Sequence, residues 1–513
     1  MSSSFSDSDE SAPFLEHEKE SVSPSYFSQL AFLSWAAARI RRVCEALKRC
    51  RNLTLPHLYR TACPPRETSS ENISPPSTST AWLDGMRGFA SFFVYIRHFA
   101  SATHTHIEFG YGQDEENHFL IQLPFLRLVV GGPAMVALFF IISGYALSWA
   151  PLRSMHYESA SKGLERLASG VFRRAIRLFM PGIVSTFLVM LCISMGLYDT
   201  GKAAVNDVDM PGFQEPGPPM LRKDPFVVQF RDWVQCTWKW LNVWKLTSHP
   251  YDVHTWTLPV EFSSSMALFL VLVAFSKCAP TIRLCLLASS VIYCHLKDNW
   301  TCWLFFAGSF LAQLKIIQDS KHAALSDCHL PTTETHANSM KMSRRIWAIK
   351  GDIARVCLFI AGLYLLSAPD FGAANDTPGY ITLSRFIPST WPESYRFLHC
   401  IGALLAVYAT SSTSTSSLRC LFDNAFSTYL GKLSYAIYLV HGPVVHMLGF
   451  WLVPWCWSLT GKETMWDKEF GFMIAFIIVT IVVLRVADWF WRYVDAKCVL
   501  FARWVEKIFT GLG

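Results

Sequence analysis

Ten apolar segments of membrane-spanning length fill most of the chain after residue 80 and limit what it can fold into. A helix needs about 20 apolar residues to cross a bilayer, and the fifth, sixth and eighth segments are the shortest of the ten. We therefore predict an all-α polytopic membrane protein with about ten transmembrane helices. The segments lie at about residues 82–100, 125–149, 174–197, 256–276, 281–297, 299–317, 353–369, 397–413, 434–453 and 470–490.

The composition excludes several other classes of protein. Hydrophobic residues make up 51% of the 513 residues and charged residues 16%, whereas ordinary globular domains carry about 25% charged residues. So little charge cannot cover several soluble domains, and it also argues against a coiled coil or a disordered scaffold. The net charge of +6 is too small to suggest nucleic-acid binding. The 15 cysteines contain no CxxC pair, so we predict neither a metal site nor a disulfide framework.

The first 80 residues differ in composition from the rest of the chain. Ser- and acid-rich residues begin this region and a Pro/Ser/Thr run ends it, which predicts a largely disordered cytosolic extension. Between them, apolar residues recur at helical spacing beside clustered arginines, which predicts a basic amphipathic helix at about 27–51 on a membrane surface. The predicted organisation is an extension at 1–80, a membrane domain at 81–495 and a cytosolic basic tail at 496–513.

The charges of the loops predict the orientation in the membrane. The segment after the first apolar run contains four acidic residues and no Lys or Arg, whereas the next loop, from Arg153 to Arg177, is strongly basic. Positively charged loops stay in the cytosol, so both termini are predicted to be cytosolic.

Two stretches are predicted to lie on the outer side of the membrane. Spaced tryptophans with the basic residues Arg231 and Lys239 between Phe226 and Trp244 are typical of an interfacial helix. Asn375 begins an N-glycosylation sequon in a predicted outer loop, so a glycan is expected there. Asn52 and Asn72 also stand in sequons but fall in the predicted cytosolic extension.

Two ionisable residues in the first apolar segment carry the strongest functional signal. Ionisable groups within a membrane cost about 2.5–3.5 kcal/mol each on insertion scales, so their presence favours a function. Arg87 and His98 stand 11 residues apart, which is about 20° past three helical turns and about 16 Å along the axis. Both side chains therefore project from one face. A histidine titrates near neutrality, and its alignment with an arginine favours proton transfer over a purely structural role.

Five motifs that occur in a fixed order resemble those of the acyltransferase-3 family of integral membrane acyltransferases. The first contains a basic residue, ten others and then a histidine, which here are Arg87 and His98. The resemblance covers about residues 80–495 and looks most like the fungal members. The motifs are Trp82-Leu-Asp-Gly-Met-Arg-Gly-Phe-Ala90 with His98, Phe139-Phe-Ile-Ile-Ser-Gly-Tyr145, Arg174-Ala-Ile-Arg177 before Pro181, Trp256-Thr-Leu-Pro-Val-Glu261, and Leu430-Gly-Lys-Leu-Ser-Tyr-Ala-Ile-Tyr-Leu-Val-His441-Gly-Pro443.

The resemblance implies that an acyl group passes from a cytosolic acyl-CoA to a hydroxyl of an acceptor. It gives His98 the role of general base or acid, which an imidazole suits because it can take the hydroxyl proton during attack on a thioester. Glu261 is expected to fix the tautomer of His98, to pair with Arg87 or to orient the acceptor, and a structural ion pair is an equal alternative. We predict His98, Arg87 and Glu261 as the catalytic residues.

The donor is predicted to bind at a cluster of arginines. Arg174 and Arg177 lie on one helical face with Arg173 beside them, and guanidinium groups bind phosphates such as those of CoA. The alternative is an anchor for anionic lipids. Ser143 is a further candidate, either as an oxyanion donor or as a small residue that permits close helix packing, and His441 is a candidate for lining the cavity.

Two other classes of protein remain open on the sequence alone. A transporter or flippase also carries charged groups on a central path, although this chain lacks paired broken helices in two similar halves. The other polytopic O-acyltransferase family would use His399, which leaves the motif around His98 unexplained. His254 is expected only at the outer mouth.

The substrates and the location follow from the family resemblance alone. We expect no tightly bound cofactor, with acyl-CoA, most simply acetyl-CoA, as the donor substrate. The acceptor is a small molecule of secondary metabolism, a glycan or a lipid. The protein is expected in the endoplasmic reticulum, the Golgi or the plasma membrane.

Overall fold

The structure, a computed structural model, describes residues 80–199, 201, 210, 222–327, 334–370, 373–391, 393–411 and 416–511. Every described residue belongs to one compact unit, Pro75–Gly513. The predicted amphipathic helix at 27–51 lies outside the described residues. The boundaries of the three predicted domains remain predictions.

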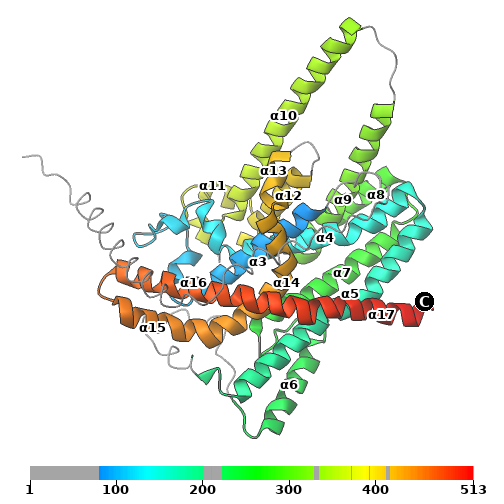
Figure 1. The fold of residues 1–513 in the computed structure, drawn as a ribbon. Coiled ribbons are helices and arrows are strands. Elements are labelled where there is room, and N and C mark those ends of the chain that lie inside the picture. Colours follow the sequence, from blue (N-terminus) through cyan, green and yellow to red (C-terminus); the bar gives the residue numbers. More distant parts are fainter. Residues whose placement is uncertain are drawn as a thin grey trace, which may run out of the picture. The chain divides into compact units, whose positions relative to one another are not determined.

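The described part of the chain consists of helices and connecting loops and contains no strand (Figure 1), as predicted from the apolar segments. The α-helices are α3 (Ala81–Ala100), α4 (Gly132–Tyr157), α5 (Ala160–Ser194), α6 (Phe226–Trp240), α7 (Thr257–Ala274), α8 (Pro280–Leu296), α9 (Trp300–Asp327), α10 (Glu334–Leu366), α11 (Ile381–Ser384), α12 (Ser394–Ser411), α13 (Ser416–Asp423), α14 (Ala425–Val444), α15 (Phe450–Thr460), α16 (Met465–Phe490) and α17 (Ala496–Thr510). Short 3₁₀ turns are η1 (Thr105–Glu108), η2 (Leu120–Gln122), η3 (Leu126–Val130), η6 (Val253–Trp256) and η7 (Ala373–Asn375), and π-turns are η8 (Val445–Gly449) and η9 (Trp491–Asp495).

Six helical segments among the described residues are long and apolar enough to cross a membrane, so the chain is a multi-pass membrane protein. Each of the ten predicted segments falls on a helix, but four of these helices are too short or too polar to be counted among the six. For example, α3 carries Asp84, Arg87 and Arg97, and α8 has only 17 residues. The six are Gly132–Tyr157, Ala160–Ser194, Val253–Ala274, Trp300–Ala324, Ala425–Thr460 and Met465–Thr510.

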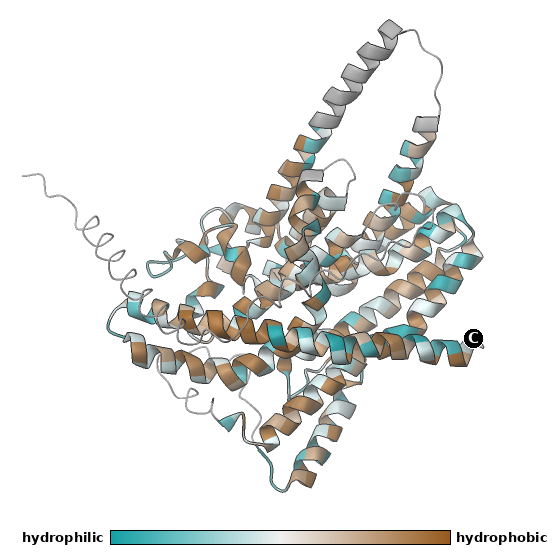
Figure 2. Ribbon diagram, in the orientation of Figure 1, coloured by the Kyte–Doolittle hydropathy of each residue, from teal (hydrophilic) through white to brown (hydrophobic). Residues whose placement is uncertain are grey.

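The segment Met465–Thr510 shows most directly that lipid surrounds part of the fold. Its α16 portion is apolar along most of its length (Figure 2), yet only 33% of its most apolar window is buried within the protein. Side chains such as Ile477 and Ile481 are exposed. A soluble protein rarely leaves an apolar face of this extent open, so lipid must cover it.

Three helix boundaries differ from the sequence prediction. The basic stretch before residue 174 is helical rather than a loop, because α5 begins at Ala160, where Ser159 caps it by accepting a hydrogen bond from the Lys162 amide. Its charged residues lower the local hydropathy without breaking the helix. The ninth segment is interrupted by a π-turn after Pro443. The predicted tail at 496–513 contains α17, which packs along α5 and pairs Glu506 with Arg173.

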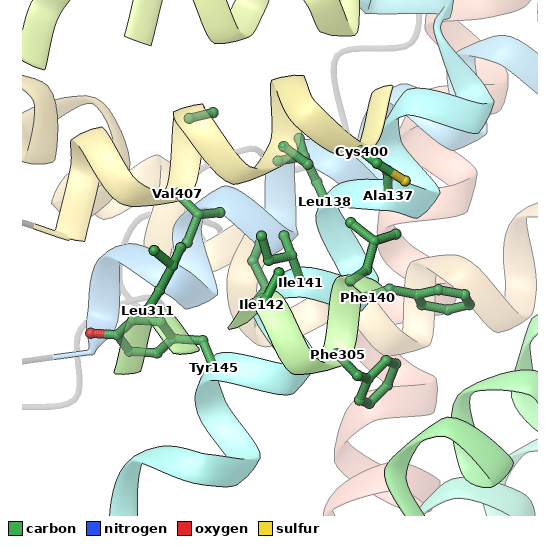
Figure 3. Close-up of a cluster of buried hydrophobic side chains, with 14 of the residues drawn as sticks. Ala137, Leu138, Phe140, Ile141, Ile142, Tyr145, Phe305, Leu311, Cys400 and Val407 are labelled. Carbon is green, nitrogen blue, oxygen red and sulfur yellow. The ribbon is translucent and has the colours of Figure 1, made fainter. Parts of the chain in front are cut away.

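Helices α4 and α9 pack so closely that only glycine fits at their crossing. A Cβ added to Gly144 would lie 2.2 Å from the Phe305 carbonyl oxygen, and one added to Gly308 would lie 2.2 Å from the Ile141 carbonyl oxygen. Side chains of α4, α9 and α12 form the buried core around this crossing (Figure 3). The crossing fixes α4, and with it the position of Ser143.

Helices α3 and α14 approach one another in the same way. A Cβ on Gly88 would lie 2.4 Å from the Gly431 nitrogen, and one on Gly431 would lie 2.5 Å from the Asp84 carbonyl oxygen. Small residues permit such backbone contact between membrane helices. The contact aligns the two helices that carry Arg87 and His441.

A buried cluster of charged residues holds the C-terminal end of α3, the turn that carries His98. Asp370 lies 3.2 Å from Arg127 and 3.8 Å from Arg97, and Arg97 also pairs with Glu108. Arg127 donates further hydrogen bonds to backbone carbonyls of the loop that follows α3. This cluster therefore fastens that loop against the helix terminus.

Replacement of Gly88 by alanine is expected to lower the free energy of unfolding by about 1–3 kcal/mol, because the new methyl group overlaps the α14 backbone. The matched control is Gly170→Ala, whose Cβ would lie no closer than 3.9 Å to the Phe269 ring and should be neutral or stabilising. Unfolding of the detergent-purified variants measures both. Equal stability of the two variants would contradict the close contact.

Candidate active site

One cavity of about 380 Å³ collects six of the eight predicted site residues. It lies between α3, α4, α5, α7 with the preceding η6, α14, and the junction of η9 with α17. Arg173 and His441 do not line it. The lining residues predicted from the sequence are Arg87, His98, Ser143, Arg174, Arg177 and Glu261.

The cavity extends along α3, from an arginine to a histidine on that helix. Arg87 and His98 both line it and belong to one uninterrupted helix. Their separation along the axis is about 16 Å, roughly half the thickness of the hydrocarbon layer. The cavity thus spans about half of the hydrocarbon layer along α3.

Glu261 is bonded to Arg174 and Ser143, which is the ion pair expected as one alternative, though with Arg174 as its partner and not Arg87. Its Oε1 accepts hydrogen bonds from Arg174 Nη2 at 2.7 Å and from Ser143 Oγ at 3.1 Å. Both charged side chains are largely buried, with 16% and 19% of their surfaces exposed. Arg174 also donates to Ser265 Oγ. The ion pair therefore joins α5 to α7, and the hydrogen bond from Ser143 connects α4 to them at the cavity wall.

The other arginines occupy three different settings. Arg87 donates from Nε to Ser434 Oγ at 2.9 Å and pairs with Asp84. Arg177 is exposed at the cavity and interacts electrostatically with Asp495. Arg173 points to Glu506. The predicted fork of three arginines is therefore divided, because only Arg174 and Arg177 face the cavity.

Three histidines from distant parts of the chain meet at the end of the cavity. The ring centroid of His98 lies 4.1 Å from that of His254 and 5.4 Å from that of His441, and the latter two are 4.8 Å apart. His98 and His254 line the cavity. Within the described part of the chain, neither ring forms a side-chain hydrogen bond, so their nitrogens are available to a substrate.

A set of buried polar contacts holds His254 in place. Tyr438 donates its hydroxyl proton to the His254 carbonyl oxygen, and its hydroxyl lies 2.7 Å from Thr257 Oγ1. The His254 amide donates to Asp252 Oδ1 at 3.2 Å. Burial raises the pKa of the Asp252 carboxyl to about 7, although that amide lowers it. Gly442 leaves room for the imidazole, since a Cβ there would lie 2.4 Å from the ring.

Sequence reasoning missed part of this arrangement. His254 was expected only at the outer mouth, yet it lies against His98. The signal was its place two residues before the Trp256–Glu261 motif, where a short 3₁₀ turn brings it inward. Tyr438 and Ser434 belong to the quoted motif from Leu430 to Pro443, on α14, but were not singled out. His399 lies apart from the cavity, bonded to the Ala368 carbonyl oxygen.

A multi-pass helical protein with imidazoles and arginines around an internal cavity has the features of a membrane enzyme. The comparison with known families gives the particular kind. A family model described as an acyltransferase domain matches residues 80–492. The chain therefore belongs to the acyltransferase-3 family and is an O-acyltransferase, as the five motifs predicted.

Three related proteins share most of their length with this chain. O-acetyltransferase PaAT-1 of Phomopsis amygdali is 30% identical over 453 residues, which cover 84% of this chain and 85% of that protein. Acyltransferase R4 of a Phoma species is 25% identical, over 83% of this chain and 96% of its own. Acyltransferase clz18 of Cochliobolus lunatus is also 25% identical, over 82% and 95%. No solved structure matches the chain.

Separate and joint replacement of Arg174 by methionine and Glu261 by glutamine should give a coupling energy of about 1–3 kcal/mol in unfolding experiments, because each single change leaves a largely buried group unpaired. The control pair is Arg492 and Asp488, which is more exposed and should couple by no more than about 0.5 kcal/mol. Additive effects at the cavity pair would show that the ion pair does not join the helices.

Proposed function

We propose that the chain transfers an acyl group, most simply acetyl, from acyl-CoA to a hydroxyl of a small-molecule acceptor. The observation that carries the proposal is the single cavity that joins His98 at one end to Arg87, Arg174 and Arg177. The similarity to a protein named O-acetyltransferase supports acetyl as the group. A small molecule of secondary metabolism is the first acceptor to test, with glycans and lipids as the other classes.

His98 acts as the base that activates the acceptor. Its imidazole takes the hydroxyl proton as the oxygen attacks the thioester carbonyl, and it returns that proton to the CoA sulfur when the carbon–sulfur bond breaks. The ring has no competing side-chain partner among the described residues, and it faces the cavity. No cofactor is needed for this exchange, because the donor supplies the activated acyl group.

The arginines bind the donor. Arg177 is exposed at the cavity and can meet the phosphates of CoA, while the acyl end reaches toward His98. Arg174 is engaged with Glu261, so it shapes the wall and contributes charge. Three arginines line the cavity, Arg87, Arg174 and Arg177, against two carboxylates, Glu261 and Asp495. This balance favours an anionic donor.

Glu261, Ser143 and Arg87 position the reacting groups. Ser143 donates to Glu261, and this bond orients both groups at the cavity wall beside the thioester. Arg87 is held by Ser434 and Asp84 with its remaining donors open to the donor phosphates. The ring of His441 stacks on that of His98, with ring centroids 5.4 Å apart.

The topology proposed here retains about ten membrane helices with both termini in the cytosol. This places the arginines near the cytosolic surface, where acyl-CoA is present, and places His98 deeper, toward the acceptor. The four helices that fall short of the apolar standard, α3 among them, are proposed to cross the membrane as well; in α3, Arg97 is buried and paired with Glu108 and Asp370. The membrane is that of the endoplasmic reticulum, the Golgi or the cell surface.

His98→Ala should abolish transfer from labelled acetyl-CoA while the protein still inserts and accumulates, because the imidazole proposed to take the hydroxyl proton is lost. A loss of about 10²–10⁴-fold in turnover is expected for a missing general base. His98→Gln should fail equally, since an amide keeps hydrogen bonding but cannot exchange the proton. Release of CoA by purified variants measures this, and near wild-type turnover in either variant would disprove the role.

Arg177→Ala should raise the KM for the acyl-CoA donor by about tenfold or more and leave the acceptor KM nearly unchanged, because a charge-assisted phosphate contact of about 1.5–3 kcal/mol is lost. Arg177→Lys should restore only part of it. The matched control is Arg173→Ala, which removes a neighbouring arginine outside the cavity. Equal effects of the two alanine variants, or full rescue by lysine, would favour a lipid anchor instead.

A further inference from the structure

We propose that His98, His254 and His441 together form a binding site for one borderline transition-metal ion such as Zn²⁺ or Co²⁺, and that the bound ion blocks acyl transfer. The site consists of the three imidazoles, which come from α3, η6 and α14. The blocking effect rests on the proposed role of His98 as proton acceptor, whereas the binding of the ion does not.

The first observation is the convergence of the ligand atoms. One nitrogen from each of the three rings lies within 4.8 Å of the other two, and among the described residues no other group of three or more metal-ligating side chains converges in this way. Tetrahedral zinc places histidine nitrogens at 2.0–2.1 Å, which puts neighbouring ligands about 3.4 Å apart. The nitrogens need to close by about 1.4 Å at most, which rotation of the side chains can supply.

The second observation is the orientation of His441. Its Nδ1 lies 3.1 Å from the Ile437 carbonyl oxygen, and because a carbonyl only accepts, the proton must be on Nδ1. The lone pair is therefore on Nε2, which is buried and has no hydrogen-bond partner among the described residues. A histidine held by its other nitrogen on a backbone carbonyl is the usual arrangement behind a metal ligand. A metal would use the otherwise unsatisfied lone pair.

The third observation concerns the surroundings of the cluster. His98 and His254 border the cavity, so a fourth coordination position remains open to water or a substrate, as in zinc sites with three protein ligands. Asp252 stands behind His254, with Oδ2 buried and without a hydrogen-bond partner among the described residues. Its charge would offset that of a dication.

The donor set selects the class of ion. Neutral imidazole nitrogens suit zinc, copper, nickel and cobalt, whereas magnesium and calcium prefer oxygen ligands. An imidazole that donates its lone pair to a metal cannot accept a proton with it. Metal binding and general-base catalysis at His98 are therefore mutually exclusive, and the ion acts as an inhibitor.

Binding is tested on the full-length chain, purified in detergent with an affinity tag that contains no histidine. Titration with Co²⁺ should produce the strong visible absorption of four-coordinate cobalt at one ion per chain, which Zn²⁺ removes and Mg²⁺ does not. His441→Ala and His254→Gln should each weaken binding on the order of 100-fold. If His441→Ala does not fold, His254→Gln carries the test, because that side chain borders the cavity.

Two variants control for other sites. His118→Ala removes an exposed histidine, and His104→Ala removes the pair of His104 with Glu469, whose atoms lie 3.0 Å apart. Both should bind cobalt as the wild type does. Absence of the absorption in the wild type, or its retention at full affinity in the folded His254→Gln variant, would overturn the proposed site.

The inhibitory effect is tested separately with the acyl-transfer assay. Zn²⁺ at concentrations that fill the site should reduce turnover by tenfold or more, a chelator should restore it, and Mg²⁺ should have no effect. If a chelator instead abolishes turnover, the inhibitory role is wrong and so is His98 as the free base. If cobalt does not bind while His98→Ala is inactive, only the metal site fails and the proposed function stands.

Discussion

The contact between the backbones of α3 and α14 is the constraint on which the rest of the site depends. Gly88 and Gly431 leave no room for a Cβ at this crossing. Since helices are rigid over three turns, a fixed crossing near Arg87 also fixes the far end of α3. The same contact therefore allows Arg87 to reach Ser434 and places the ring of His98 beside that of His441. Two glycines thus position an arginine and a histidine cluster about 16 Å apart.

A membrane bundle gains little from hydrophobic contact between its helices, so polar contacts and close packing carry more of its organisation. The pair of Glu261 with Arg174 illustrates this, because it joins α7 to α5 and, through Ser143, to α4. Each partner alone would be costly in this setting. Near the C-terminal end of α3, the buried Asp370 lies between Arg97 and Arg127 and pairs with both.

The sequence predicted well those features that depend on one helix. The separation of Arg87 and His98 follows from helical geometry alone, and both line the cavity. It predicted poorly the features that depend on which helices meet. The partner of Glu261 is on another helix, so several partners were equally reasonable, and Arg174 was not among those considered. The metal-ligating group escaped notice for the same reason, because its members stand 156 and 187 residues apart in the chain and show no local spacing pattern.

The proposed chemistry needs no net exchange of protons between His98 and solvent. Transfer of an acyl group from a thioester to a hydroxyl consumes one hydroxyl proton and produces one thiol proton, so the overall reaction neither takes up nor releases protons. His98 holds the proton only between the two bond changes, and the charge that forms on its ring is short-lived. Exclusion of water from the acyl end of the cavity would be an advantage, because water would compete with the acceptor for the activated acyl group. The enzyme must therefore keep a lone pair on His98 free to accept the hydroxyl proton at the start of each cycle. The neighbouring rings of His254 and His441 leave that lone pair free when no metal is present. With a metal ion bound between the three rings, the lone pair would be used as a ligand.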